Sequence, residues 1–174
     1  MRLLLLSIAV FGSLVVEARR ASDNEHAQRR RGGIEPAGDV YRLMRIAYPA
    51  TFAAMIAEGL FRDPPPAAAI AAGVLVLAAG KALKWWAIVT LGPRWTFRIV
   101  VVPNVPLIRG GPYRWLRHPN YVGVVGELLG VALIAGAWVS GPAAIAAFGA
   151  LLLKRIRVEE RMLATASRAS KTSK

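Results

Sequence analysis

The chain has 174 residues, of which 55% are hydrophobic, and its 23 Lys and Arg residues against 10 Asp and Glu residues give a formal charge of +13. This length suits one domain, and so much apolar surface excludes a disordered tail protein. The sequence has no Cys and two His, which excludes disulfide scaffolds and thiolate metal sites, so no metal is expected. A chain that is both basic and this apolar points to a membrane and away from nucleic acid.

Five apolar segments are predicted to form helices, at residues 3–16, 46–61, 67–91, 121–140 and 142–153. A hydrocarbon core of ~30 Å needs about 20 helical residues, so the third and fourth segments are comfortable spans and the others are borderline. The first segment also resembles a cleavable signal peptide, because Arg2 precedes a short apolar run that ends near Val16 and Ala18. The distribution of charge favours its retention as a helix.

Most of the basic residues lie between the first and second segments, between the third and fourth, and after the fifth. With five retained spans these stretches share one side, and the positive-inside rule places them in the cytoplasm, with the N-terminus outside. Abundant Ala and Arg favour a bacterial source, and hence the inner membrane. The predicted fold class is all-α, an integral membrane bundle of about five transmembrane helices with a C-terminal helical hairpin. The domain covers residues 1–163, and residues 164–174 are expected to form a disordered cytoplasmic tail.

Four ionisable residues fall within the apolar segments, where a charge is costly unless it faces protein or water: Glu58, Lys81, Lys84 and Glu127. Lys84 is expected to extend toward the cytoplasmic surface beside a Trp pair. Glu127 shares a helix face with Gly123 and Gly130, which predicts close packing there. Two roles stay open for Glu127: a catalytic or cavity-lining group, or a buried partner of Lys81 or Lys84.

The fourth and fifth segments are predicted to form a hairpin that turns near Ser140 and Gly141. At 1.5 Å per residue, both arms return to about the same depth, ~30 Å from the turn. Residues 117–121 and 155–160 should therefore be neighbours. Pro119 suits the first position of a helix, whose free N–H groups and dipole favour an anion. A basic helix start that faces lipid headgroups is the alternative for this cluster.

Arg155 and Glu159 are spaced i, i+4 with the Arg first, which is the weaker orientation for a helical ion pair. Stability is therefore a poor reason for this arrangement. A solvated amphipathic helix end is one interpretation. Recognition is the other, because carboxylates beside an anion site suit a ligand with a negative group, a positive group and sugar hydroxyls.

The stretch from Leu107 to Gly123, LIRGGPYRWLRHPNYVG, with Glu159 and Glu160 further on, resembles the isoprenylcysteine carboxyl methyltransferase family of integral membrane enzymes. Residues 84–100 are especially similar to the bacterial branch whose members methylate alkylpyrones or alkylresorcinols. The resemblance implies S-adenosylmethionine as methyl donor, bound in a cytoplasm-facing pocket, and a lipid-facing passage for a lipophilic acceptor. It also implies the membrane and a lipophilic or lipidated substrate as partners.

Motif positions imply the residues that contact the cofactor: Val105, Pro106, Leu107, Ile108, Tyr113, His118, Pro119, Asn120, Tyr121 and Glu159, with Glu160 as a substitute for Glu159 after a one-residue shift. Arg155 matches the arginine that meets the acceptor's oxygen anion, and Glu127 completes the candidate catalytic residues. The expected reaction is O-methylation of an alkylpyrone-like enol or phenol, or of an isoprenylcysteine carboxylate. The alternatives are a phospholipid or amine N-methyltransferase, which has less use for Arg155, and a non-enzymatic basic protein that binds anionic lipid.

Overall fold

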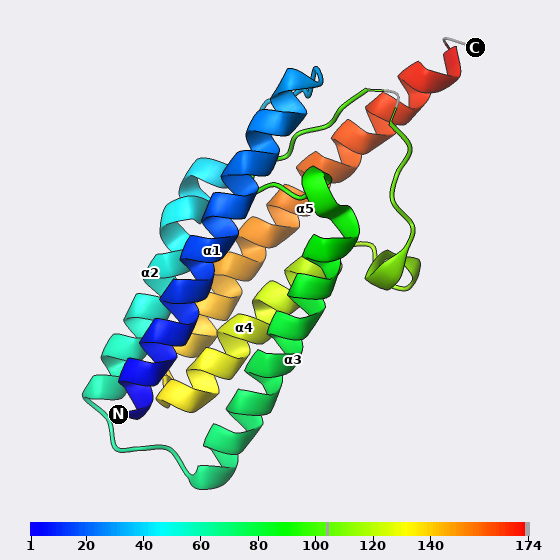
Figure 1. Cartoon of the computed structure of the whole chain (residues 1–174). Helices are drawn as coiled ribbons and strands as arrows, with labels where there is room; N and C mark the ends of the chain where they lie inside the picture. Colours follow the sequence, from blue (N-terminus) through cyan, green and yellow to red (C-terminus); the bar gives the residue numbers. More distant parts are fainter. Residues whose placement is uncertain (104, 173–174) are drawn as a thin grey trace.

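The computed structural model describes residues 1–103 and 105–172, with side chains up to residue 165. Five long helices make up the fold (Figure 1): α1 (Arg2–Arg30), α2 (Tyr41–Leu60), α3 (Ala67–Leu91), α4 (Pro119–Ala135) and α5 (Ser140–Thr172). Two short 3-10 helices, η1 (Gly92–Arg94) and η2 (Gly111–Arg114), lie in the connection between α3 and α4. The described residues form no strand, and their one isolated β-bridge joins Ile34 to Val101. The predicted all-α class is confirmed.

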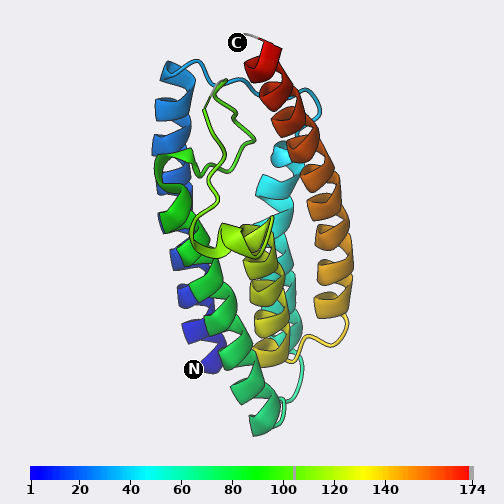
Figure 2. The same ribbon diagram turned by 90° about the vertical axis from the view of Figure 1, so that its right-hand side faces the viewer.

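The helices run alternately up and down, so their connections gather at two ends of the bundle (Figures 1 and 2). The N-terminus, the α2–α3 turn and the α4–α5 turn lie at one end. The connections at residues 31–40 and 92–118 lie toward the other, together with the last turns of α5. We call this second end the basic end, because the three Arg- and Lys-rich stretches lie there, as the sequence predicts.

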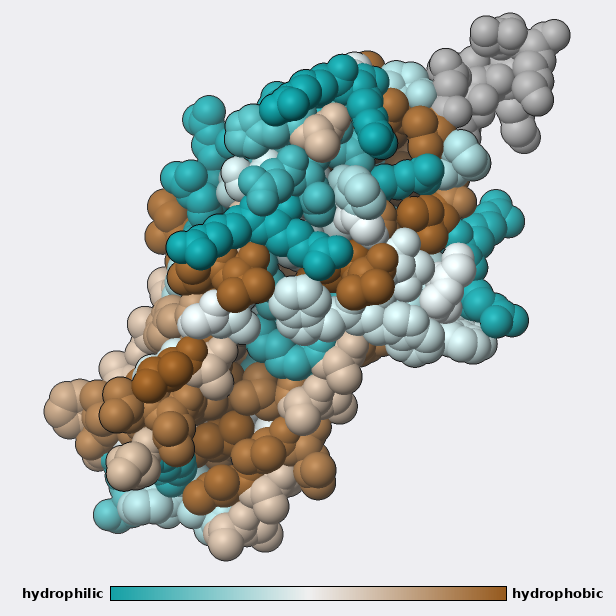
Figure 3. Space-filling model, viewed as in Figure 1, coloured by the Kyte–Doolittle hydropathy of each residue, from teal (hydrophilic) through white to brown (hydrophobic). Residues whose placement is uncertain are grey.

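Surface hydropathy changes along the bundle. The part nearer the N-terminus is largely hydrophobic, whereas hydrophilic residues concentrate toward the basic end (Figure 3). By length and composition, one helical stretch of the described chain, Ala67–Arg94, is long and apolar enough to cross a membrane. The fourth segment, predicted as a comfortable span to residue 140, is also apolar, but its helix α4 has 17 residues because it ends at Ala135.

The helix α1 is longer than predicted, because it continues through the polar stretch after residue 19 to Arg30. Its polar half packs against the start of the α3–α4 connection. The Asn24 amide donates to the carbonyls of Gly92 at 3.2 Å and Trp95 at 2.7 Å, and the Gln28 amide donates to that of Pro93 at 2.8 Å. The sequence alone did not predict this extension, because the polar half of α1 is held by residues that are distant in the chain.

The helix α5 also extends beyond its predicted apolar segment. It runs to Thr172, past residue 164, where the sequence predicts the tail to begin. Residues 173–174 of that predicted tail lie outside the described part of the chain.

The helices α3 and α4 pack closely, with Gly facing Gly. A Cβ atom on Gly80 would lie 2.9 Å from the carbonyl oxygen of Gly123, and one on Gly130 would lie 2.7 Å from the amide nitrogen of Leu77. Two helices can approach this closely only where the residue at the contact is a glycine, which has no side chain. The predicted packing of the Gly123 and Gly130 face is therefore confirmed.

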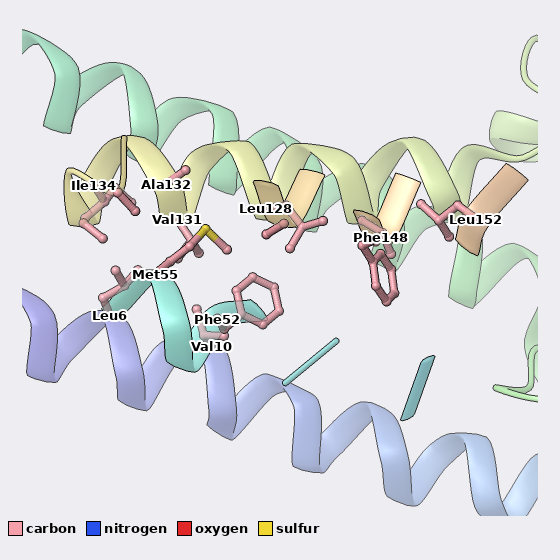
Figure 4. Packing of buried hydrophobic residues seen from close by; sticks show 14 residues of the cluster. Leu6, Val10, Phe52, Met55, Leu128, Val131, Ala132, Ile134, Phe148 and Leu152 are labelled. Carbon is pink, nitrogen blue, oxygen red and sulfur yellow. The ribbon is translucent and has the colours of Figure 1, made fainter. Parts of the chain in front are cut away.

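The hydrophobic core lies between α4 and the helices α1, α2 and α5 (Figure 4). Fully buried side chains from α2 and α4 form its centre: Phe52, Met55, Leu128 and Val131. Phe148 and Leu152 of α5 complete it on the side that continues toward the basic end. This packing fixes the hairpin of α4 and α5, and with it the relative positions of residues 117–121 and 155–160.

Candidate active site

A cavity of about 1420 Å³ extends from the basic end into the bundle. All five helices and the α3–α4 connection contribute to its wall. Its inner part is apolar, and its wall there includes Phe11 and Leu14 of α1 and Phe148 and Leu152 of α5. Toward the basic end, the wall changes to polar and charged groups. A typical ligand pocket has a volume of about 300–1,000 Å³, so this cavity is larger than one small ligand requires.

Most of the predicted site residues line this cavity: Val105, Pro106, Leu107, Ile108, Tyr113, His118, Asn120, Tyr121, Arg155, Glu159 and Glu160. Pro119 and Glu127 do not line its described part. Pro119 is buried and opens α4, as its sequence position predicts. Glu127 lies deeper, among buried charges.

The start of α4 is shaped by the His118–Pro119 pair. His118 is the N-cap residue, and it lies outside the helical region with φ −130° and ψ 60°, since a residue before proline is driven from the helical conformation. Its carbonyl accepts the N–H groups of Tyr121 at 3.1 Å and Val122 at 3.2 Å. Its ring stacks on that of Tyr121, with centroids 5.5 Å apart. The first turn of α4 thus points its dipole toward the cavity region that His118 and Asn120 line.

The acidic pair of α5 lies against this helix start, as the hairpin geometry predicts. The Tyr121 hydroxyl donates to a Glu159 carboxylate oxygen at 2.7 Å, and His118 Nδ1 lies 3.9 Å from the same oxygen. His118 Nε2 lies 3.3 Å from Glu160, which also pairs with the exposed Arg117 at 3.5 Å. An anion-favouring helix start and two carboxylates therefore share one side of the cavity.

Tyr113 of η2 lines the cavity near these groups. Burial, and then the negative charge of Glu159, raise the pKa of the Tyr113 phenol well above its usual value. A raised pKa means that the neutral phenol is favoured over the phenolate. The Tyr113 hydroxyl therefore stays protonated, and available as a hydrogen-bond donor, through the alkaline range.

Arg155 is 5% exposed, and its guanidinium is bonded on three sides. Nε donates to the Tyr121 hydroxyl at 2.9 Å, Nη1 donates to Asp39 at 3.1 Å, and Nη2 donates to the Phe97 carbonyl. The carboxylate that pairs with Arg155 is therefore Asp39, which was not among the predicted site residues. Asp39 follows Gly38, and a Gly-Asp pair indicates a turn and nothing about a distant partner.

Asp39 also holds two backbone segments together. Its carboxylate accepts the N–H of Tyr41 at the start of α2 and that of Ile99 in the α3–α4 connection, each at 3.0 Å. The 31–40 connection, the 92–118 connection and α5 thus converge on one side chain.

A second cluster of charges lies inside the bundle: Glu17, Lys81, Lys84 and Glu127. Glu17 lies 2.6 Å from Lys84 and 3.1 Å from Lys81, and Glu127 lies 3.2 Å from both lysines. The Tyr48 hydroxyl donates to Glu127 at 2.5 Å. The structure thus brings Glu127 into the buried pairing, one of its two predicted roles.

Lys84 is 2% exposed, so the expectation that it extends to the surface is wrong. The reason is Glu17, whose carboxylate satisfies the ammonium within the bundle. Glu17 directly follows the first apolar segment, and no sequence pattern predicted a partner for it. Lys84 and Tyr48 both line the cavity, so this ion cluster borders it.

Glu58, the fourth ionisable residue of the apolar segments, binds the start of α5. Its carboxylate accepts the N–H groups of Val139 at 3.1 Å and Ser140 at 2.7 Å, and pairs with Arg62 at 2.7 Å. These bonds join α2 to the α4–α5 turn, at the end of the bundle opposite the cavity mouth.

Comparison with known proteins gives a family for this chain. The family model for isoprenylcysteine carboxyl methyltransferases matches residues 71–165, which include most of α3, the α3–α4 connection, α4 and the lining part of α5. The Bacillus subtilis (strain 168) protein YpbQ, described as uncharacterized, is 33% identical over 144 residues, which cover 82% of this chain and 85% of YpbQ. An uncharacterized protein of Haemophilus influenzae is 26% identical over 151 residues, which cover 86% of each chain. No solved structure matches.

Proposed function

Because the chain belongs to the isoprenylcysteine carboxyl methyltransferase family, we propose that it is an S-adenosylmethionine-dependent O-methyltransferase of the bacterial inner membrane that acts on a lipophilic acceptor. One observation carries the proposal. A single cavity joins a polar region, formed by the start of α4 and the Glu159–Glu160 pair, to an apolar region between α1 and α5. A charged methyl donor and a lipophilic acceptor need such a combination.

The polar region has the donor and acceptor groups that S-adenosylmethionine requires. The start of α4 suits the α-carboxylate, since free N–H groups and the helix dipole favour an anion. Glu159 and Glu160 suit the ammonium group and the ribose hydroxyls. When bound, S-adenosylmethionine supplies a sulfonium methyl group to a nucleophilic oxygen. Tyr121 orients Glu159 through its 2.7 Å hydrogen bond, and the connection at residues 105–108 lines the same cavity.

The apolar region suits the chain of a lipophilic acceptor. Phe11, Leu14, Phe148 and Leu152 line it, and Arg155 lies where it meets the polar region. We therefore assign Arg155 to the acceptor's reacting oxygen, with an alkylpyrone-like enol or phenol favoured over an isoprenylcysteine carboxylate. Catalysis then rests on alignment of the two ligands and on exclusion of water by the surrounding side chains.

The proposed membrane arrangement is supported by the distribution of apolar and basic residues along the bundle. The apolar part of the bundle suits the bilayer, and the basic end suits the cytoplasmic surface, with five spans and the N-terminus outside. In this orientation the polar region of the cavity opens to the compartment that contains S-adenosylmethionine.

The test is methyl transfer by the purified protein. The protein, reconstituted in lipid nanodiscs, is incubated with methyl-labelled S-adenosylmethionine and a lipid extract of the producing cells, and products are identified by mass spectrometry. The proposal predicts label on an oxygen of a lipophilic product, lost in Arg155→Ala. Label on nitrogen would identify an amine or phospholipid N-methyltransferase, and no transfer with no saturable cofactor binding would identify a lipid-binding protein.

A further inference from the structure

We propose that Asp39 sets the acceptor specificity of this site by neutralising Arg155, so that the site selects a protonated hydroxyl acceptor, such as an enol or phenol, over an ionised carboxylate. The inference rests on the proposed function and deepens it. It begins from the Asp39–Arg155 ion pair, whose atoms lie 3.1 Å apart.

The two side chains differ in their access to the cavity. Arg155 lines the cavity, whereas Asp39 lies outside its described lining and contacts Arg155 from the protein side. Both are largely buried, with side-chain exposures of 6% and 12%. Solvent therefore screens the pair weakly, and the carboxylate charge reaches any ligand that contacts the guanidinium.

Charge around the guanidinium disfavours a second anion. Asp39 balances the charge of Arg155, and Glu159 lies one hydrogen bond further on, through the Tyr121 hydroxyl. An acceptor carboxylate would meet a cation that is already paired and a second carboxylate nearby, and juxtaposition of like charges is costly.

A hydroxyl acceptor meets no such cost. A guanidinium has five N–H donors, and the bonds to Tyr121, Asp39 and the Phe97 carbonyl use three of them. The remaining N–H groups can donate to a neutral oxygen without a counter-charge. Asp39 is thus a positioning and specificity-determining residue, because it acts on the acceptor through Arg155.

The alternative role for Asp39 is structural, because it also accepts the N–H groups of Tyr41 and Ile99. A structural role alone affects every ligand alike. A specificity role changes the ratio of affinities for charged and neutral ligands, and that ratio is the quantity to measure.

The experiment compares a long-chain fatty acid with the primary alcohol of the same chain length, at mildly alkaline pH where the acid is ionised. Dissociation constants are measured for the wild type, Asp39→Asn and Glu35→Gln. Glu35 is the matched control, because it lies in the same 31–40 connection as Asp39 and its carboxylate pairs with Arg98 at 3.4 Å and with Arg29 instead of with Arg155. Asp39→Asn should shift the affinity ratio toward the fatty acid by about tenfold or more, and Glu35→Gln should leave it unchanged.

Arg155→Gln gives a second, independent measurement should Asp39→Asn fold poorly. It removes the cation and leaves Asp39 without its charge partner, so the ratio should move toward the alcohol. An unchanged ratio in either variant, or equal loss of both ligands in Asp39→Asn, would overturn the inference. If neither probe binds to the wild type, the inference would also be overturned, since the cavity would then not be the acceptor site.

Cofactor binding separates this inference from the proposed function. Asp39→Asn should bind S-adenosylmethionine as the wild type does, because Asp39 acts on the acceptor side. Failure of the wild type to bind the cofactor would refute the proposed function, whereas intact cofactor binding with an unchanged acceptor ratio would refute the specificity role alone.

Discussion

The buried charge cluster gives a prediction whose size follows from the structure. Glu17 is fully buried, and it lies 2.6 Å from Lys84, which is 2% exposed. With Lys81 and Glu127, the cluster has two negative and two positive charges. Glu17→Gln keeps the shape of the side chain and removes one charge, so the bundle then holds an uncompensated ammonium.

Removal of one partner from a buried ion pair costs about 3–5 kcal/mol, and we take the lower end because Gln can still accept a hydrogen bond. For a chain of 150–250 residues, each kcal/mol shifts the melting temperature by about 2–4 °C. Glu17→Gln should therefore melt roughly 6–12 °C below the wild type. The assay is thermal unfolding in detergent, followed by the helical circular dichroism signal.

Two further variants make this test specific. Glu25→Gln is the matched control on α1, because its ion pairs with Arg29 at 3.0 Å and Arg98 at 3.3 Å are partly exposed and contribute at most about 1 kcal/mol each. Combining Glu17→Gln with Lys84→Met restores neutrality, so the double variant should lose less than the two single losses added. Equal melting of Glu17→Gln and the Glu25→Gln control, or full additivity in the double variant, would refute the charge-balance argument.

Three more predictions concern packing, chemistry and orientation. Gly80→Leu should lower the melting temperature, because even its Cβ would lie 2.9 Å from a backbone oxygen of α4. Gly149→Leu is the control, because a Cβ there would meet open space, and it should have the melting temperature of the wild type. Arg155→Ala should lose turnover and keep its cofactor affinity in a binding titration, and parallel loss of both would disprove its assignment to the acceptor. A protease added outside spheroplasts should not cleave at residues 29–31, and cleavage there would reverse the proposed orientation.

Local sequence patterns predicted the helices and the relation of the last two. The apolar runs located all five, and the predicted hairpin brought Tyr121 and Glu159 together, as their 2.7 Å hydrogen bond confirms. The predicted turn at Ser140 and Gly141 was wrong, because α4 ends at Ala135 and α5 already begins at Ser140. Pro119 marked the start of α4, and the small residues at Gly123 marked the face that packs on α3. These features depend on spacing along one helix or one hairpin, which a sequence displays directly.

Partners that are distant in the chain could not be predicted in this way. Arg155 and Asp39 are 116 residues apart, and Lys81 lies 64 residues from Glu17. From local spacing, Glu159 was the one candidate partner of Arg155, and Lys84 was expected at the membrane surface. In the structure Arg155 pairs with Asp39 and Lys84 pairs with Glu17, because tertiary packing brings these distant carboxylates to them. The polar half of α1 was missed for the same reason, because its partners are carbonyl groups of residues 92–95.

Binding of labelled S-adenosylmethionine to the purified protein tests the central claim most directly, with Glu159→Gln and Glu160→Gln measured beside the wild type. The wild type should bind saturably, and Glu159→Gln should weaken binding by about tenfold or more, since a hydrogen bond to a charged group contributes about 1.5–3 kcal/mol. A smaller loss is expected for Glu160→Gln, because Glu160 is more exposed and pairs with Arg117. A wild type without saturable binding, or Glu159→Gln with undiminished affinity, would contradict the assignment of this cavity to the methyl donor.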